Sequence, residues 1–209
     1  NKFPESNIES SKVMQFKKMT LAASAAVAVA GVQAQTVVDF ESFNLGGATF
    51  LDTPQTMNFI NVGNTNVDMT ILGHDDLRVY DLAKFNSGGG GYASPGPQAL
   101  IDMNWNTYSN PKGTDIVFSQ GVSNFSLIAG DFGSDADTSL RIEAFGSSGN
   151  SLGISTAIWS NSAFPPFAKL SLNVNDIFRV HYSSGGPYAN STFIDDITFT
   201  ATAVPEPEA

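Results

Sequence analysis

Short β-strand patterns separated by turn residues run through most of the chain, and no segment has the period of an amphipathic helix. In Ser139–Phe145, for example, Leu140 and Ile142 alternate with Arg141 and Glu143, which is typical of a strand with one face in a core and the other in water. Segments of this kind are separated by loops rich in Gly, Pro, Asn and Ser. We expect strands at Val37–Ser42, Met57–Val62, Val67–Leu72, Leu77–Tyr80, Ala99–Met103, Asp115–Phe118, Asn124–Asp131, Ser139–Phe145, Leu152–Ile158, Lys169–Leu172, Ile177–Tyr182 and Phe193–Thr200. About a dozen short antiparallel strands at this spacing predict an all-β, two-sheet β-sandwich of the jelly-roll kind.

Residues 14–34 carry the pattern of a secretory leader. Lys17 and Lys18 give a basic start after Met14, an uncharged apolar run extends from Met19 to Val32, and Val32-Gln33-Ala34 has small residues where a signal peptidase reads. The run is shorter than the ~20 residues that span a bilayer, so we expect residues 14–34 to be a removed signal peptide of an exported protein. Residues 1–13 are polar and unpatterned, and we expect them to be disordered read-through from upstream of the gene.

The charge of the remaining chain limits its partners. Residues 35–209 hold six basic and eighteen acidic residues, a net charge of −12. Such a surface repels nucleic acid and anionic lipid and suits divalent cations, which carboxylate oxygens bind. The chain has no cysteine, which excludes disulfides, thiolate metal sites and cysteine nucleophiles. At 175 residues this part is long enough for one domain with a real core, which we place at residues 35–202.

The last residues carry a sorting motif. Val204-Pro205-Glu206-Pro207 directly after a β-rich domain resembles the start of a PEP-CTERM tail, the C-terminal sorting signal of many Gram-negative exported proteins. In that family the motif is followed by an apolar span and an Arg-rich end, so the resemblance implies that residues 203–209 begin a tail continuing beyond Ala209. It also implies an exosortase-type processing enzyme as partner, contact with the membrane only through the missing span, delivery to the cell surface or matrix, and an association with exopolysaccharide and biofilm.

The final strand places a carboxylate where apolar residues are expected. Alternation in Phe193–Phe199 puts Asp195 on the same face as Phe193, Ile197 and Phe199. A carboxylate facing a core is costly unless it is hydrogen-bonded, paired or bound to a metal. It could cap a turn, pair with an Arg or a backbone amide, or ligate a cation.

Two short motifs resemble the galactose-binding-like sandwich of many carbohydrate-binding modules. Phe40-Glu41 matches the Phe-Glu pair of their first strand, and Ile194–Ile197 matches the aliphatic-Asp-Asp-aliphatic run of their last strand. The same ends, with Gly130–Gly133 between them, resemble a sandwich common among PEP-CTERM proteins. The resemblance implies that the first and last strands lie close together and that a structural calcium binds there. By position, it nominates Glu41 and Asp195 as ligands, with Asp196 and Asp39 in reserve and backbone carbonyls completing the shell.

Aromatic residues in the loops suggest a site for sugar rings, which lectin-like proteins hold by stacking. The alternative is that these side chains anchor the loops to the core. The candidates, all in or beside loops, are Tyr92, Trp105, Tyr108, Trp159 and Tyr188.

Signals for catalysis are few. His74 precedes two aspartates and His181 lies on the polar face of a strand, but two histidines cannot build a three-His zinc site. No Gly-x-Ser-x-Gly motif is present. The acidic cluster of Asp131, Asp135 and Asp137 lacks the Gly and terminal Glu of an EF-hand loop, and a solvated turn is the simpler interpretation.

We therefore expect a non-enzymatic, exported surface or matrix protein. A glycan-binding domain with a structural calcium is the alternative, and a glycoside-active enzyme is a more distant one.

Overall fold

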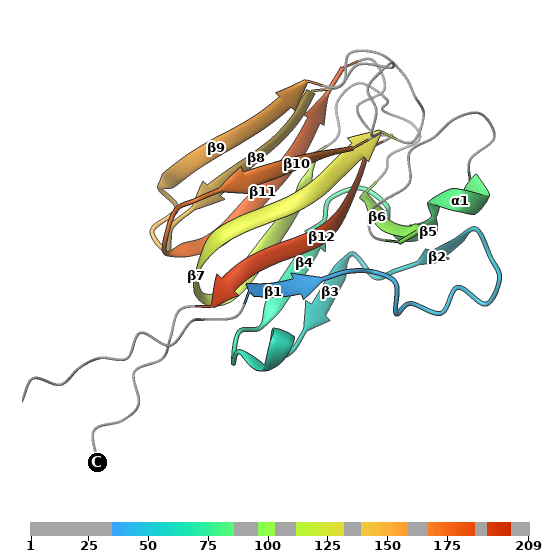
Figure 1. Cartoon of the computed structure of the whole chain (residues 1–209), viewed down its shortest axis with the longest axis horizontal. Helices are drawn as coiled ribbons and strands as arrows, with labels where there is room; N and C mark the ends of the chain where they lie inside the picture. The colour runs from blue at the N-terminus through green and yellow to red at the C-terminus, as the bar shows by residue number, and fades with distance from the viewer. Residues whose placement is uncertain are drawn as a thin grey trace, which may run out of the picture. The chain divides into compact units, whose positions relative to one another are not determined.

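The computed structural model describes residues 35–85, 96–102, 112–131, 139–158, 167–186 and 192–201. The side chains of Asn64, Phe85 and Asp131 are not described. In the described residues, antiparallel strands make up nearly all regular structure (Figure 1). The elements are β1 (Gln35–Val38), β2 (Phe50–Asp52), β3 (Thr56–Phe59), η1 (Val62–Asn64), β4 (Met69–Gly73), β5 (Leu77–Asp81), α1 (Leu82–Phe85), β6 (Gln98–Asp102), β7 (Thr114–Asp131), β8 (Ser139–Phe145), β9 (Ser151–Ile158), β10 (Phe167–Leu172), β11 (Ile177–Gly185) and β12 (Thr192–Ala201).

The long strand β7 joins two layers of strands. Its first half, around Thr114–Phe118, pairs with β4 on one side and β11 on the other, and this layer continues through β3, β8 and β9. Its second half, Val122–Asp131, pairs with β10 and β12, and this layer continues through β6, β5 and β2, with β1 alongside β12. We call these the β4 layer and the β12 layer. The predicted all-β, antiparallel sandwich is confirmed.

The main core lies between the two layers. Leu140, Ile142 and Ala144 of β8 contribute to it, while Arg141 and Glu143 lie on the other face, as their alternation predicts. At the bend of β7, the ring of Phe118 meets the rings of Phe125 and Phe199 at centroid distances of 6.2 and 5.0 Å, both edge-on. Edge-to-face packing of this kind adds to the stabilisation from buried area.

A second, smaller cluster covers the opposite face of the β12 layer. Tyr80, Leu82, Ala99, Ile101 and Phe193 pack together there, beside the short helix α1. Because the β12 layer is covered on both faces at this end, β6 is a continuous apolar run rather than an alternating one. None of the helices in the described ranges has the length and apolar character that crossing a membrane requires.

Two differences from the expected strands have physical reasons. Asp115–Phe118 and Asn124–Asp131 were expected as separate strands, but both belong to the single strand β7, because residues between them also pair: Val122 lies opposite Ile177 of β11 and Ser123 opposite Thr200 of β12. Strand β2 was not expected, because its three residues are all exposed and show no alternation in burial.

The aromatic packing at the bend of β7 gives a first prediction. Phe199 is fully buried (0% exposed), and we expect Phe199→Ala to lower the free energy of unfolding by about 3–5 kcal/mol, because the cavity can close only in part. Ile158→Ala is the control, because Ile158 is 87% exposed, and its effect should stay within about 0.5 kcal/mol. Denaturant unfolding measures both, and equal effects would contradict the core described here.

Candidate functional site

A β-bulge in β12 brings two carboxylates to the same side of the strand. Asp195 pairs with Ile128 of β7 and Thr198 pairs with Ser126, so β12 has one more residue than β7 over this stretch. Ile194 and Ile197 both pack in the main core, so the two aspartates between them lie on the opposite side. Asp196 has a left-handed φ of 46°, a conformation that Asp tolerates better than most residues.

The bulge corrects the face assignment made from sequence. Asp195 was expected to share a face with Phe193, Ile197 and Phe199, but Phe193 packs in the smaller cluster and the other two pack in the main core. A straight strand would keep all four together, and the extra residue at Asp196 reverses the alternation after it. The predicted burial of Asp195 is confirmed, on the face away from the main core.

Asp195 is a fully buried carboxylate that no hydrogen bond from the described residues reaches. Its exposed fraction is 0%, and neither carboxylate oxygen has a hydrogen-bond partner in the described residues. Burial, followed by the negative charges of Asp196, Glu41 and Asp39, raises the pKa of Asp195 to about 8, and the nearby amide of Asp196 offsets this only in part. An Arg partner, one of the alternatives left open by the sequence, is absent among the described residues.

The other two acids lie just after β1, which pairs antiparallel with β12 from Gln35↔Thr200 to Val38↔Ile197. The expected closeness of the first and last strands is confirmed. Glu41 is held in place by a hydrogen bond that its Oε1 accepts from the amide of Gln98 (2.8 Å). Its carboxyl group fits there because Gly96 has no Cβ, which would collide with it. Asp39 Oδ1 accepts a hydrogen bond from the amide of Glu41 at 3.3 Å.

These four acids, Asp39, Glu41, Asp195 and Asp196, form what we call the carboxylate cluster. Burial, and then the charges of Asp39 and Glu41, raise the pKa of Asp196 to about 6, although Lys169 partly offsets them. The acids therefore lie within electrostatic range of one another. Within the described residues, no three His, Cys, Asp or Glu side chains form a ready-made metal shell, so a cation here would need the side chains to adjust.

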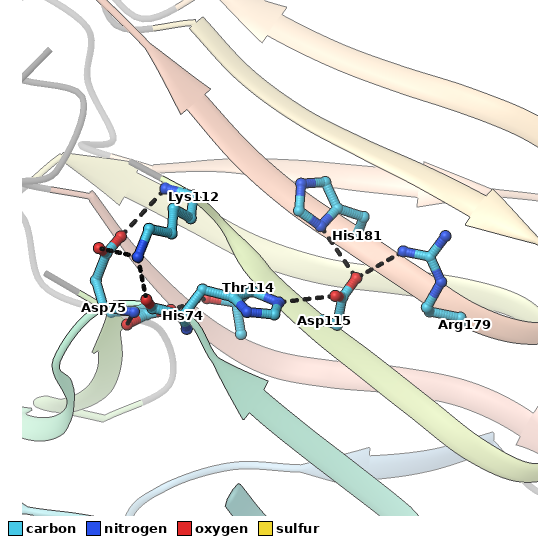
Figure 2. A network of polar contacts seen from close by, with 8 residues as sticks. His74, Asp75, Lys112, Thr114, Asp115, Arg179 and His181 are labelled. Carbon is cyan, nitrogen blue, oxygen red and sulfur yellow. Dashed lines mark hydrogen bonds and ion pairs between the residues drawn. The ribbon is translucent and has the colours of Figure 1, made fainter. Parts of the chain in front are cut away.

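A second polar group of residues lies on the outer face of the β4 layer and is centred on Asp115 of β7 (Figure 2). Asp115 accepts hydrogen bonds from three side chains: His74 Nε2 at 2.8 Å, Arg179 Nη1 at 2.8 Å and His181 Nδ1 at 3.0 Å. Burial alone would raise the pKa of Asp115, but the hydrogen bonds from His181, His74 and Arg179 prevail and hold it well below its usual range. We call these four residues the Asp115 network.

The loop after β4 is fixed beside this network. Asp102 accepts hydrogen bonds from the amides of His74 (2.7 Å) and Asp75 (2.9 Å), and Lys112 Nζ donates to the carbonyl of His74 at 3.3 Å. Asp75 Oδ2 accepts from the amide of Lys112 at 3.1 Å (Figure 2). These contacts orient His74 toward Asp115.

The side chains of the Asp115 network hydrogen-bond to one another, and a nucleophile for catalysis is not found beside them among the described residues. In the part of the chain described, no Ser or Thr hydroxyl is hydrogen-bonded to either imidazole, so the nucleophile of a His-Asp dyad is missing there. Sequence reasoning noted His74 and His181 but missed Asp115 and Arg179, whose partners come from strands distant in the sequence. Their placement on polar faces of alternating strands was the available signal.

The aromatic residues predicted to bind glycan all lie outside the described residues: Tyr92, Trp105, Tyr108, Trp159 and Tyr188. Of the acids in the predicted turn, Asp135 and Asp137 also lie outside them, and the side chain of Asp131 is not described.

No protein-family model and no curated protein matches the sequence. Among solved structures, the chain is similar to a DUF4465 family protein from Bacteroides caccae, with a TM-score of 0.54 and 12% identity over 81% of this chain and 100% of that one. A DUF4465 family protein from Bacteroides ovatus matches at a TM-score of 0.41 and 8% identity, over 78% and 93% of the two chains. A carbohydrate-binding module from Clostridium stercorarium, solved with cellobiose, matches at a TM-score of 0.34 and 11% identity, over 80% and 94%. At these identities, the similarity to the first protein establishes the fold alone.

Proposed function

We propose that this domain is an exported, non-catalytic β-sandwich that binds glycan and is stabilised by calcium at the carboxylate cluster. The observation that carries the proposal is Asp195, a fully buried carboxylate with no hydrogen-bond partner among the described residues and three other acids in electrostatic range. The Asp115 network, in which a carboxylate accepts three hydrogen bonds, is the internal comparison, because it needs no ligand to be stable.

Calcium fits the chemistry of the cluster. An unpaired buried charge is costly, and a divalent cation would offset both the desolvation of Asp195 and the mutual repulsion of the acids. Calcium takes six to eight oxygen ligands in flexible geometry and tolerates carboxylates bound by one or two oxygens. Glu41 and Asp195 are the principal proposed ligands, Asp196 and Asp39 the additional ones, and backbone carbonyls would complete the shell.

Glycan binding is supported by the architecture and by the placement of aromatic residues in the sequence. A rigid sandwich commonly presents recognition residues on its loops, and Trp105 and Tyr108 lie in the sequence between β6 and β7, where we expect a loop from the Asn- and Pro-containing sequence. The strongly acidic composition disfavours polyanions, so we propose a neutral glycan. A matrix protein that needs only stability and an anchor is the competing function.

Export and anchoring remain part of the proposal on sequence grounds. The leader at residues 14–34 and the motif Val204–Pro207 support secretion and sorting by an exosortase-type enzyme to the cell surface or to biofilm material. Both segments lie outside the described residues.

The first test of the calcium proposal is thermal melting of the domain in excess calcium and in chelator. A ligand of the folded state contributes about 2.7 kcal/mol at a hundredfold excess over Kd, which corresponds to a rise in Tm of roughly 5–10 °C for a domain of this size. We expect Asp195→Asn to abolish most of this rise, because Asn keeps the shape and removes the charge. Asp52→Asn is the matched control at a carboxylate that is 72% exposed, and it should keep the full rise. A chelator that leaves the wild-type Tm unmoved would rule out the site.

The second test uses pH in the absence of calcium. The pKa of Asp195 is about 8 in the folded protein, above its ordinary value of 3.8, so the folded state holds this proton more tightly than the unfolded state. The resulting stabilisation is complete below about pH 4 and is lost as the pH rises through 8, and Asp196, with a pKa of about 6, acts in the same direction. In chelator we therefore expect the Tm of the wild type to fall, relative to that of Asp195→Asn, between pH 5 and pH 9. Parallel curves for the two proteins would contradict this.

The third test addresses glycan binding. We expect the wild type to bind at least one neutral polysaccharide on a glycan array, and we expect Trp105→Ala to weaken binding about tenfold, because stacking on an indole contributes about 1 kcal/mol or more. Absence of binding to every glycan on the array would favour the matrix-protein function. Binding that Trp105→Ala leaves unchanged would remove that residue from the site.

A further inference from the structure

A groove on the outer face of the β12 layer lies next to the carboxylate cluster. It has a volume of about 240 Å³ and is formed by residues of β1, β7, β10 and β12, including Val37, Ile128, Lys169 and Asp196. Val37 alternates with Val38, which packs in the main core, so its side chain lies on the opposite, outer face. Asp196 lies on that face too, because of the bulge.

Two charged side chains of the groove, those of Asp196 and Lys169, lack a hydrogen-bond partner among the described residues. Asp196 Oδ1 is buried without a hydrogen-bond partner in the described residues. Lys169 has no hydrogen bond or ion pair with any of them either, although its charge lowers the pKa of Asp196 and so must lie near it. The carboxylate of Asp196 and the exposed ammonium of Lys169 therefore border the same small space. Buried polar atoms in native proteins usually have partners, so Asp196 Oδ1 indicates a missing ligand.

The groove offers apolar contacts beside its polar groups. Val37 is 56% exposed, and Ile128 is partly buried against the smaller apolar cluster. A hydroxyl-bearing ring has the matching chemistry: its hydroxyls can donate to Asp196 and accept from Lys169, while its C–H face lies against Val37 and Ile128. A free anion is disfavoured because the other three acids of the carboxylate cluster lie near Asp196.

We propose that this groove is a subsite for one ring of a neutral polysaccharide, formed by residues other than the candidate aromatics. The inference rests on the proposed glycan-binding function and assigns it a second contact surface. At about 240 Å³ the groove is smaller than the ~300–1,000 Å³ typical of pockets that enclose a whole ligand, so it holds one unit of a longer chain. Asp196 belongs both to the groove and to the carboxylate cluster, which places the sugar beside the proposed cation.

The experiment measures affinity by isothermal titration for a neutral polysaccharide that the wild type binds, selected from β-glucan, xylan, galactan and mannan. Lys169→Met removes the charged donor at nearly constant length, and Val37→Arg fills the groove. Ile154→Arg is the matched control, because Ile154 lies in β9 of the other layer and is 53% exposed, close to the 56% of Val37. Each variant is also melted with and without calcium, which checks its fold and its cation site.

We expect Lys169→Met and Val37→Arg to weaken polysaccharide binding at least tenfold while keeping the calcium-dependent rise in Tm, and Ile154→Arg to bind like the wild type. If the wild type binds and both groove variants bind equally well, the subsite is wrong and the glycan-binding function stands. If the wild type binds none of the polysaccharides, the glycan-binding function falls and the subsite falls with it. Either result leaves the calcium site to be judged by the melting data alone.

Discussion

Strand β7 is the element on which both layers depend, because each of its halves is hydrogen-bonded on two sides. Its first half is paired with β4 and β11 and its second half with β10 and β12, so one continuous backbone fixes how the layers face each other. The carboxylate cluster follows from this arrangement. β12 carries its bulge between Asp195 and Thr198, which pair with Ile128 and Ser126 of β7, and the extra residue directs Asp195 and Asp196 away from the main core.

Asp115 and Asp195, one partly and one fully buried, solve the same electrostatic problem in opposite ways. Asp115 gains three donors, and its pKa falls well below the usual range. Asp195 gains three acidic neighbours instead, and its pKa rises to about 8. Burial raises the pKa of both carboxyl groups, so the neighbouring groups decide whether the pKa ends below or above its usual value. Local stability alone would favour the first arrangement, and the second is therefore the one that indicates a ligand.

Much of the fold could be predicted from alternation, because each strand of a two-layer sandwich has one face in the core. The pattern in Ser139–Phe145 predicted β8 with its observed bounds and faces. Alternation in the final strand also predicted that Asp195 is buried. It did not predict which face of the strand carries Asp195, because hydrophobic alternation does not reveal a bulge of one residue. The Asp115 network could not be predicted, because it requires the register of β11 against β7, where His181 lies opposite Asp115. That register depends on turns and packing between segments far apart in the chain.

The pairing of β1 with β12 has a consequence for the order in which the molecule can form. Gln35 lies opposite Thr200, so the first strand of the domain has no edge to join until the last strand has been made. β12 is also the strand that β7 and β6 pair with, and without it the β12 layer is divided into separate pieces. During synthesis from the N-terminus, the chain must therefore remain without its closing contacts until residues 192–201 emerge. Until β12 is present, the edges of β1, β6 and β7 that pair with it stay open, and open strand edges can pair with other chains.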